Sequence, residues 1–450
     1  MVLAVLSIAQ FLIALDYSII YIALPSVAAD LDLEPATAQW VVSAYAVLFA
    51  GFLVVGGRLS DRVGAGRMFT VAIVAFGVAS AVGGIAGDGA TLLAARGAQG
   101  LAAALMQPAI LGLIGSTFTA GARRGAALAV WSAVGAAGLA AGAILGGVLT
   151  TASWRLTFFI NVPLTLACAL AALRWFAAAR PTGAERIPVR AAVLGTAAVL
   201  SLVLGLTLGA DRGWRDPATL VTVGLAVVLL VGFVHTERTA RAVLIEPALR
   251  ATASLRTGAA ATALYMASVG SEFYLLTLLL QQLKGYDPLK AGLAFLPLAV
   301  MVTAGNLLAG RLLRHLSAPA VLLGGFALAT VGLAWLSITL SGTDYAADLL
   351  PGLVLSGLGH GVIYTSMFVI GTHDVPAAQQ GTSGALLTTS QYLSGAVTLA
   401  VLTLVLGPTP DQPDFRAAFL LTTAAAGAGA VLAAVRVRRP APRGHVLVSP

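Results

Sequence analysis

Three ionisable side chains lie inside segments that are otherwise apolar enough to cross a bilayer. Asp16 lies within FLIALDYSIIYIALP, Arg96 within the apolar run 90–115, and Glu272 within the run 256–281. A charge at the centre of a membrane costs roughly 2.5–3.5 kcal/mol on insertion scales, so such residues are usually retained for a function. At ~1.5 Å per helical residue the three share about one depth. We expect them to face a common, partly hydrated cavity in which Arg96 neutralises a carboxylate; the alternative is an inert structural ion pair.

The composition is that of a polytopic membrane protein. Of the 450 residues, 59% are hydrophobic and 10% are charged, which leaves too few polar residues to cover a soluble globule of this size. The formal charge of +8 is compatible with nucleic-acid binding, but the 26 basic residues are spread between apolar runs, so no nucleic-acid partner is expected. The single cysteine, Cys168, excludes a disulfide scaffold and a cysteine metal cluster.

Fourteen apolar runs have the length of a membrane-spanning helix, which predicts an all-α fold with both termini on one side of the membrane. Loops on that side, with the C-terminal tail, hold nineteen arginines, whereas the opposite loops hold six basic residues and most of the acidic ones. By the positive-inside rule both termini face the cytoplasm. The predicted spans are 3–25, 39–57, 68–87, 90–115, 125–150, 157–174, 191–210, 217–235, 256–281, 291–310, 319–340, 349–371, 382–406 and 415–435.

A short internal repeat indicates two related halves. GRLSDRVGA follows the second run and GRLLRHLSA follows the tenth, 253 residues later, while Asp16 and Glu272 are 256 residues apart. Two such halves around a site at the membrane midplane are typical of alternating-access transporters. We therefore expect an N-terminal six-helix half (1–175), a linker that carries helices seven and eight (176–250), a C-terminal six-helix half (251–436) and a tail (437–450).

Several motifs in order along the chain resemble those of one transporter family. They are LDYSIIYIALP in the first run, QWVVSAYAV in the second, GRLSDRVGAGR after it, RGAQGLAAA in the fourth, GLAAGAILGG in the fifth, and the stretches WRLTFFINVP and LLQQLKGYDPLKAGLAFLP. Nearly the whole chain resembles the fourteen-helix drug:proton antiporters of the major facilitator superfamily, the EmrB/QacA-like group. The resemblance implies the major facilitator fold, no cofactor and no metal, and a small-molecule substrate exchanged for protons across the bilayer.

The resemblance also suggests roles for the buried charges. Arg96 is similar to the fourth-helix arginine with which such transporters adjust the proton affinity of a carboxylate. Asp16 is then the principal protonation site and Arg96 its modulator. Glu272 matches no family motif, and its assignment as a second carboxylate, for a proton or a cationic substrate, depends on its position within the apolar run alone.

The stretch GRLSDRVGAGR resembles the family's gate motif. Its candidate residues are Gly57, Asp61, Arg62, Gly64 and Arg67. By the family pattern Asp61 faces the N-terminus of the thirteenth helix, which opens with GTSG and attracts an anion through its free N–H groups and dipole. The family usually has basic residues where Ala65 and Gly66 stand here, so part of the usual charge network is missing. A basic loop that only sets membrane topology is the simpler interpretation, and both can hold.

The fifth run carries a glycine face that resembles the family's antiporter motif. Its candidate residues are Gly138, Gly142, Gly146 and Gly147. Glycines at four-residue spacing let a neighbouring helix approach closely. The resemblance adds that this face seals the cavity against leak, although Ala143 stands where the family has a kinking proline.

Other polar and aromatic residues are candidates for a substrate cavity. Tyr265 shares a helical stripe with Ser268 and Glu272. Aromatic rings in a membrane bundle are more often packing residues, and amides often only bridge helices. The cavity candidates are Tyr17, Tyr21, Trp131, Tyr265, Phe273, Asn306, Tyr364 and Gln391.

These observations favour a proton-coupled exporter of lipophilic drugs, cationic ones among them, or of a self-made natural product, in the cytoplasmic membrane of a bacterium. The bacterial source follows from an arginine-, alanine- and glycine-rich composition. A uniporter or importer of the same fold remains an alternative. A membrane-embedded enzyme is disfavoured because the sequence has no HExxH motif and no GxSxG elbow in a suitable context, and no phosphate-binding loop for ATP is present.

Overall fold

The computed structural model describes residues 1–119, 121–176, 188–240, 243–286, 288–342, 344–407 and 410–438. Within these ranges the chain is helical, with no strand, and fourteen helical segments are long and apolar enough to cross a membrane. The predicted all-α fold with fourteen spans is therefore confirmed. Most of the predicted tail 437–450, from residue 439 onward, lies outside the described residues, as do Arg180, Arg186, Arg241, Arg439 and Arg443, which contributed to the predicted orientation.

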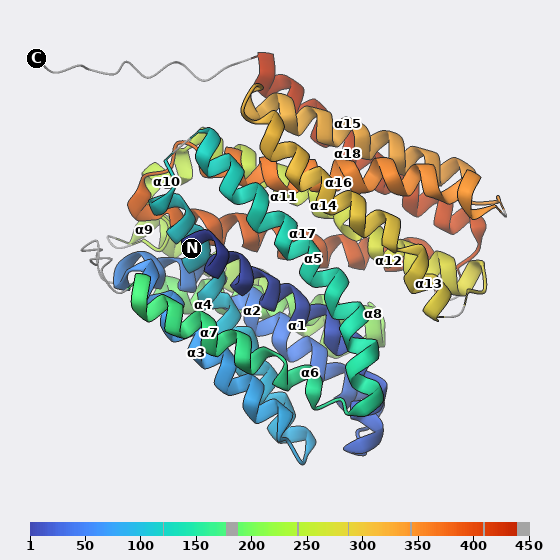
Figure 1. The fold of residues 1–450 in the computed structure, drawn as a ribbon, viewed down its shortest axis with the longest axis horizontal. Coiled ribbons are helices and arrows are strands. Elements are labelled where there is room, and N and C mark those ends of the chain that lie inside the picture. Colours follow the sequence, from blue (N-terminus) through green and yellow to red (C-terminus); the bar gives the residue numbers. More distant parts are fainter. Residues whose placement is uncertain are drawn as a thin grey trace, which may run out of the picture.

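The first six spans form one lobe, drawn in blue and green in Figure 1 and called the N-terminal lobe here. Its first five spans are single helices, and the sixth consists of the short α6 followed by α7. The elements are α1 (Val2–Asp30), α2 (Pro35–Val63), α3 (Ala65–Gly84), α4 (Gly89–Thr117), α5 (Ala122–Ala152), α6 (Leu156–Phe159) and α7 (Asn161–Trp175).

The last six spans form the C-terminal lobe, drawn in yellow to red (Figure 1). Two of its spans are interrupted: a 3₁₀ turn separates α11 from α12, and Phe295 separates α13 from α14. The elements are α10 (Pro247–Ala251), α11 (Ala253–Ala267), the 3₁₀ turn Val269–Ser271, α12 (Glu272–Leu278), the π-helical turn Leu279–Leu283, α13 (Pro288–Ala294), α14 (Leu296–Leu312), α15 (Ala318–Thr339), the π-helical turn Tyr345–Leu349, α16 (Leu350–Gly371), the 3₁₀ turn Ala377–Gln379, α17 (Gln380–Leu406) and α18 (Gln412–Arg438).

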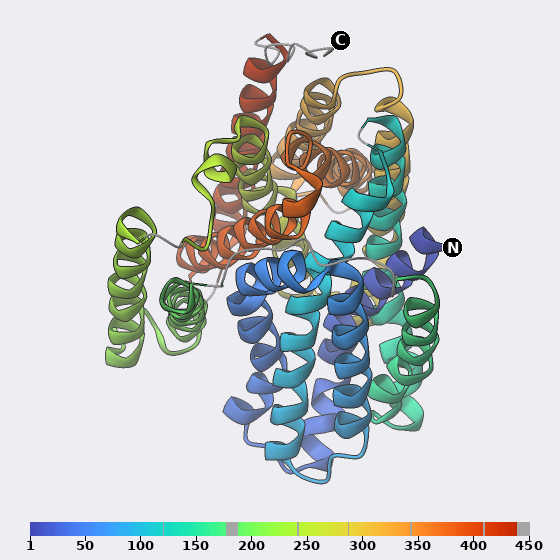
Figure 2. The ribbon, with the colours of Figure 1, turned by 90° about the vertical axis from the view of Figure 1, so that its left-hand side faces the viewer.

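Helices α8 (Val189–Arg212) and α9 (Pro217–Thr239) are the pair inserted between the lobes. Figure 2 shows them at one edge of the molecule, with α9 outermost. Helix α8 packs against α2 of one lobe and α17 of the other, so it covers one side of the seam between them.

Local sequence explains several helix ends. Asp88 precedes α4, and its carboxylate accepts hydrogen bonds from the Thr91 N–H and hydroxyl at 2.8 Å each, which lowers the pKa of Asp88. Gly64 has a φ of 96° and separates α2 from α3. The segment 58–63, which the sequence placed in a loop, is helical and forms the end of α2; of its charged residues, Asp61 is buried and Arg62 is exposed.

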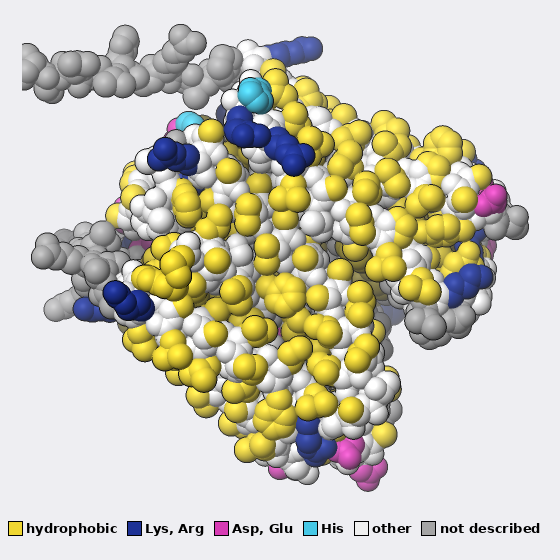
Figure 3. Space-filling model, viewed as in Figure 1, with side chains coloured by type: hydrophobic (Ala, Val, Ile, Leu, Met, Phe, Trp, Pro, Cys, Tyr) yellow, Lys and Arg dark blue, Asp and Glu magenta, His cyan; other side chains and the backbone are white. Residues whose placement is uncertain are grey.

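The lobes meet closely at the end of the molecule where the chain termini lie, called the terminal end below. A Cβ at Gly57 of α2 would lie 2.9 Å from the Thr382 Cα, and one at Gly384 of α17 would lie 2.5 Å from Leu111 of α4. At the other end, called the open end, Tyr21 and Ile22 of α1 are 49% and 44% exposed. Figure 3 shows the two lobes separating toward this end. The structure is therefore closed at the terminal end and spread at the other.

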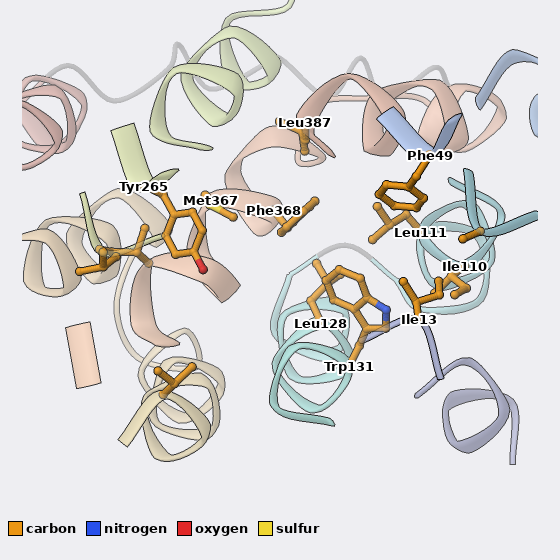
Figure 4. Close-up of a cluster of buried hydrophobic side chains, with 14 of the residues drawn as sticks. Ile13, Phe49, Ile110, Leu111, Leu128, Trp131, Tyr265, Met367, Phe368 and Leu387 are labelled. Atoms are coloured by element: carbon orange, nitrogen blue, oxygen red, sulfur yellow. The ribbon is translucent and has the colours of Figure 1, made fainter. Parts of the chain in front are cut away.

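A cluster of apolar side chains fills the centre between the lobes (Figure 4). Trp131 of α5 points toward Ile13 and Ile110 of its own lobe, and Phe368 of α16 reaches toward it from the other lobe. Trp131 and Phe368 are both fully buried. Because Trp131 and Phe368 lie 5.3 Å apart between ring centroids, this cluster joins the two lobes.

Candidate functional site

Asp16 is the centre of a buried hydrogen-bond network in the N-terminal lobe. Its Oδ2 accepts a hydrogen bond from Arg96 Nη1 at 2.7 Å, and its Oδ1 accepts from Gln99 Nε2 and Asn161 Nδ2 at 2.9 Å each. Asp16 and Arg96 are each 1% exposed. Both carboxylate oxygens are thus occupied by donors, and the charge of Arg96 balances that of Asp16 away from water.

Arg96 and Gln99 connect this carboxylate to the neighbouring helices. Arg96 Nε donates to the Val41 carbonyl of α2 at 2.9 Å, and its guanidinium lies 4.6 Å from the centre of the Tyr45 ring. Gln99 Nε2 also donates to Ser80 Oγ of α3 at 2.8 Å. Because five of the six spans of the lobe contribute a group, a movement of Arg96 changes contacts through most of the lobe.

Sequence reasoning missed four members of this network: Ser80, Tyr45, Gln99 and Asn161. Three of them had a signal, since Tyr45 lies in QWVVSAYAV, Gln99 in RGAQGLAAA and Asn161 in WRLTFFINVP, all of which resemble family motifs. Ser80 lies in an apolar run outside these motifs and had none.

Glu272 lies in the C-terminal lobe and does not join this network. It is 0% exposed, and its Oε1 accepts a hydrogen bond from Ser356 Oγ of α16 at 2.6 Å. Its Oε2 has no hydrogen-bond partner among the described residues, and no ion pair or hydrogen bond there joins it to Asp16 or Arg96. The expected cluster of three charges is therefore two separate sites, because Arg96 directs its guanidinium into its own lobe.

An interruption in the ninth span lies beside Glu272. Ser268, between α11 and the 3₁₀ turn, has φ −118° and ψ −107°, outside the helical range. Two serine hydroxyls donate hydrogen bonds to backbone carbonyl groups near the break. Ser268 Oγ donates to Leu264 O and Ser271 Oγ donates to Met266 O, each at 2.6 Å. Glu272 opens the segment on the far side, as the first residue of α12.

His360 packs against the same break from α16. Its Nε2 is hydrogen-bonded to the Tyr265 hydroxyl, and its Nδ1 has no hydrogen-bond partner among the described residues. The Phe273 ring lies edge-on to the imidazole at 6.2 Å between centroids. His360 is 7% exposed and is the only histidine within the predicted spans of the C-terminal half.

The substrate-cavity candidates divide into packed and accessible groups. Trp131 stacks on Tyr364 across the seam at 6.0 Å, and Tyr265 lies 5.5 Å from Tyr364. Gln391 interacts with the Tyr364 hydroxyl. Asn306 Oδ1 accepts from Thr365 Oγ1 at 2.9 Å, which bridges α14 and α16.

The accessible group lies nearer the open end. Tyr17 and Tyr21 of α1 meet edge to face at 5.7 Å between ring centroids, with their hydroxyls 3.4 Å apart. Phe273 is 36% exposed and stacks on Phe295 at 5.8 Å. Tyr21 and Phe273 are therefore the exposed candidates, Tyr17 and Tyr364 are half-buried, and Trp131 is buried.

Asp61 joins the two lobes at the terminal end. Its carboxylate accepts hydrogen bonds from the backbone N–H groups of Gly381 and Thr382 at 3.0 and 2.9 Å and from the Thr382 hydroxyl at 2.6 Å. A carboxylate at the start of α17 is stabilised by the free N–H groups and the helix dipole. This is the contact that the resemblance implies for Asp61.

The other gate-motif residues have different surroundings. Arg62 and Arg67 are exposed. A Cβ at Gly66 would lie 2.5 Å from the Phe176 carbonyl, so the start of α3 and the end of α7 pack where the family has a basic side chain.

Arg58, which was not among the predicted site residues, donates to Glu246 at 2.9 Å and to the Val243 carbonyl at 3.0 Å. Glu246 also accepts from Gln379, so the linker after α9 contacts both lobes.

The glycine face of α5 packs against α1, the helix that carries Asp16. A Cβ at Gly138 would lie 2.7 Å from the Phe11 carbonyl, and one at Gly142 would overlap Ser18 Oγ. One at Gly146 would lie 3.1 Å from Ile22 Cβ, whereas Gly147 has nothing within 4 Å. Three of the four predicted glycines therefore form the contact, and Gly147 does not.

Comparisons with known proteins agree with this geometry. The model of the Major Facilitator Superfamily matches residues 6–399. The cephamycin export protein CmcT of Amycolatopsis lactamdurans is 37% identical over 404 residues, which are 89% of this chain and 83% of that protein. The puromycin resistance protein pur8 of Streptomyces alboniger is 35% identical over 408 residues, 90% of this chain and 81% of that protein. The crystal structure of the human organic anion transporter MFSD10 (TETRAN) is similar in fold, with a TM-score of 0.70 and 15% identity over 96% of this chain and 98% of that one.

Proposed function

The chain belongs to the Major Facilitator Superfamily, and on that premise we propose that it exports an antibiotic-like small molecule across a bacterial cytoplasmic membrane in exchange for protons. Members of this family are transporters and not enzymes. The observation that carries the proposal is the buried Asp16–Arg96 pair, which offers a protonation site inside an apolar lobe.

Protonation of Asp16 changes the contacts of a whole lobe. The ionised carboxylate accepts three hydrogen bonds and balances Arg96. A proton on Asp16 removes the charge that Arg96 neutralises, and an unpaired buried guanidinium then favours a new arrangement of α4 against α1 and α2. Tyr17 and Tyr21 continue along α1 from Asp16 toward the open end, which gives a proton a short route to the carboxylate.

The arginine-rich loops support a cytoplasmic terminal end. With that orientation, the Asp61 contact with α17 closes the cytoplasmic side and the structure is the outward-facing state. The return to the inward-facing state requires these hydrogen bonds and the close packing at Gly57 to separate.

The substrate class is proposed from the relatives and from the accessible aromatic residues. Two of the proteins that this chain is similar to are a cephamycin exporter and a puromycin resistance protein. We therefore infer a natural-product antibiotic as substrate, with aromatic contacts at Tyr17, Tyr21 and Phe273. Glu272 is a second carboxylate available to a proton or to a cationic group.

The proposal is tested by efflux from bacterial cells that express the protein. Ethidium and puromycin are the probes, each measured with and without a protonophore, in the wild type and in Asp16→Asn at matched membrane expression. We expect efflux that the protonophore and the substitution both abolish. Glu34→Gln, at an exposed site near the open end, is the matched control and should export normally. Efflux that resists the protonophore, or full export by Asp16→Asn, would refute proton coupling at this site; accumulation in place of efflux would support the importer alternative.

A further inference from the structure

The C-terminal lobe contains a buried acid that lacks the partners of its counterpart in the N-terminal lobe. Glu272 is fully buried, with a single hydroxyl donor from Ser356 and no cationic partner among the described residues. An ionised carboxylate in such surroundings is strongly disfavoured, so in this conformation the group is held as the neutral acid.

The groups that face Glu272 and His360 from the packed helices are almost all uncharged. Helix α17 carries no charged side chain, and the charged side chains of α11, α14 and α18 lie near the helix ends. The Tyr265 phenol is hydrogen-bonded to His360, and the phenols of Tyr364 and Tyr392 lie near Tyr265. His360 is therefore the one side chain in the described part of this region that can become a cation near neutral pH.

His360 lies on the same helix as Ser356, the residue that donates a hydrogen bond to Glu272. Ser356 and His360 are four residues apart on α16, so they lie on one face in successive turns. One turn of this face is hydrogen-bonded to Glu272 through Ser356, and the next is hydrogen-bonded to Tyr265 beside the helix break. A rotation of α12 about the 3₁₀ turn Val269–Ser271 would move the carboxyl along α16 between these two turns.

We propose that His360 is the counter-ion of Glu272: the Glu272 carboxyl transfers its proton to the His360 imidazole, and the resulting carboxylate and imidazolium pair with each other. The transfer leaves the total charge of the two groups unchanged. The C-terminal lobe then forms its ion pair in a different conformation from the one in which Asp16 and Arg96 are paired. The inference rests on the proposed proton coupling, but its test does not need transport.

The test follows the protonation of Glu272 by infrared difference spectroscopy on the purified full-length protein in lipid vesicles over a pH titration. The carboxylic-acid band that Glu272→Gln removes belongs to Glu272. In the wild type this band should be weakened at neutral pH, because in the conformation in which the two groups pair the proton resides on His360. In His360→Gln the band at neutral pH should be stronger, because the proton has no imidazole to move to. Tyr265→Phe, which removes the hydroxyl that holds His360, should change the intensity of the band less than His360→Gln does.

The control is His235→Gln, which changes an exposed histidine at the end of α9 and should leave the Glu272 titration unchanged. Folding of each variant is checked by size exclusion and circular dichroism, and His360→Asn replaces His360→Gln if the latter misfolds. The proposal is overturned if the Glu272 acid band at neutral pH is no stronger in both His360 variants than in the wild type. A stronger band in these variants with no ethidium or puromycin efflux by the wild type would instead reject the proposed function and leave this inference standing.

Discussion

The two lobes place a carboxylate at matching positions and treat it differently. Asp16 lies within α1, an uninterrupted helix of 29 residues, and has an arginine and two amides as donors. Glu272 lies beside a break in the corresponding span and has one serine as donor. In the N-terminal lobe, an uninterrupted helix carries an acid that has a charged partner. In the C-terminal lobe, an interrupted span carries an acid that has none among the described residues.

The largest expected effect tests whether the two carboxylates differ in charge. Asp16→Asn leaves Arg96 buried without a counter-ion, and we expect it to lower the free energy of unfolding by about 3–5 kcal/mol. Glu272→Gln exchanges one neutral group for another of the same shape and should change it by less than about 1 kcal/mol. Denaturant unfolding of the purified variants in detergent measures both.

The double variant Asp16→Asn/Arg96→Gln is the control for this pair. Since it removes both charges, it should recover part of the stability that Asp16→Asn loses while transport stays absent. Equal losses for Asp16→Asn and Glu272→Gln would show that both acids are ionised and would remove the difference between the lobes.

A second prediction concerns the rigid packing of α1. Gly142→Ala places a methyl group against Ser18 and the Leu15 carbonyl, so we expect a loss of about 1–3 kcal/mol in the free energy of unfolding. Gly147→Ala meets open space and should cost little, which makes it the matched control on the same helix. The same unfolding measurement applies. If both substitutions are neutral, α1 is less constrained than the close contact with α5 indicates.

A third prediction extends the comparison to the ends of the lobes. Asp61→Asn removes the charge that α17 stabilises, and we expect the closed terminal end to be destabilised by about 1–2 kcal/mol. Spin labels at Arg67→Cys and Arg314→Cys, in a Cys168→Ser background, report the distance between lobes at this end. The population with separated lobes should increase; Arg62→Gln, at an exposed position of the same motif, should leave the distribution unchanged.

The sequence supported part of this picture. The burial cost of a charge was enough to single out Asp16, Arg96 and Glu272, and the apolar runs predicted the fourteen spans. The partners of Asp16 were harder to predict, because the sequence does not distinguish a neutral amide such as Asn161 that binds a carboxylate from one that bridges two helices. The break at Ser268 contains the Gly270–Ser271 pair, a type of pair at which helices often kink, but no proline marks it and the apolar run continues through it. Whether Trp131 packs or lines a cavity depends on the conformation of the lobes, which a sequence pattern does not encode.

The smallest expected effect concerns the linker between the lobes. Glu246 accepts hydrogen bonds from Arg58 of α2 and from Gln379 beside α17, so the segment after α9 connects the two lobes next to the Asp61 contact. The Glu246 side chain is 38% exposed, which screens its pairing with Arg58, and Glu246→Gln should therefore destabilise the closed end by less than about 1 kcal/mol. The spin-label distances that report Asp61→Asn measure this change too, with Glu34→Gln as the control. A response as large as that of Asp61→Asn would mean that the inserted helices take part in closing the terminal end, because an exposed ion pair alone is too weak to have that effect.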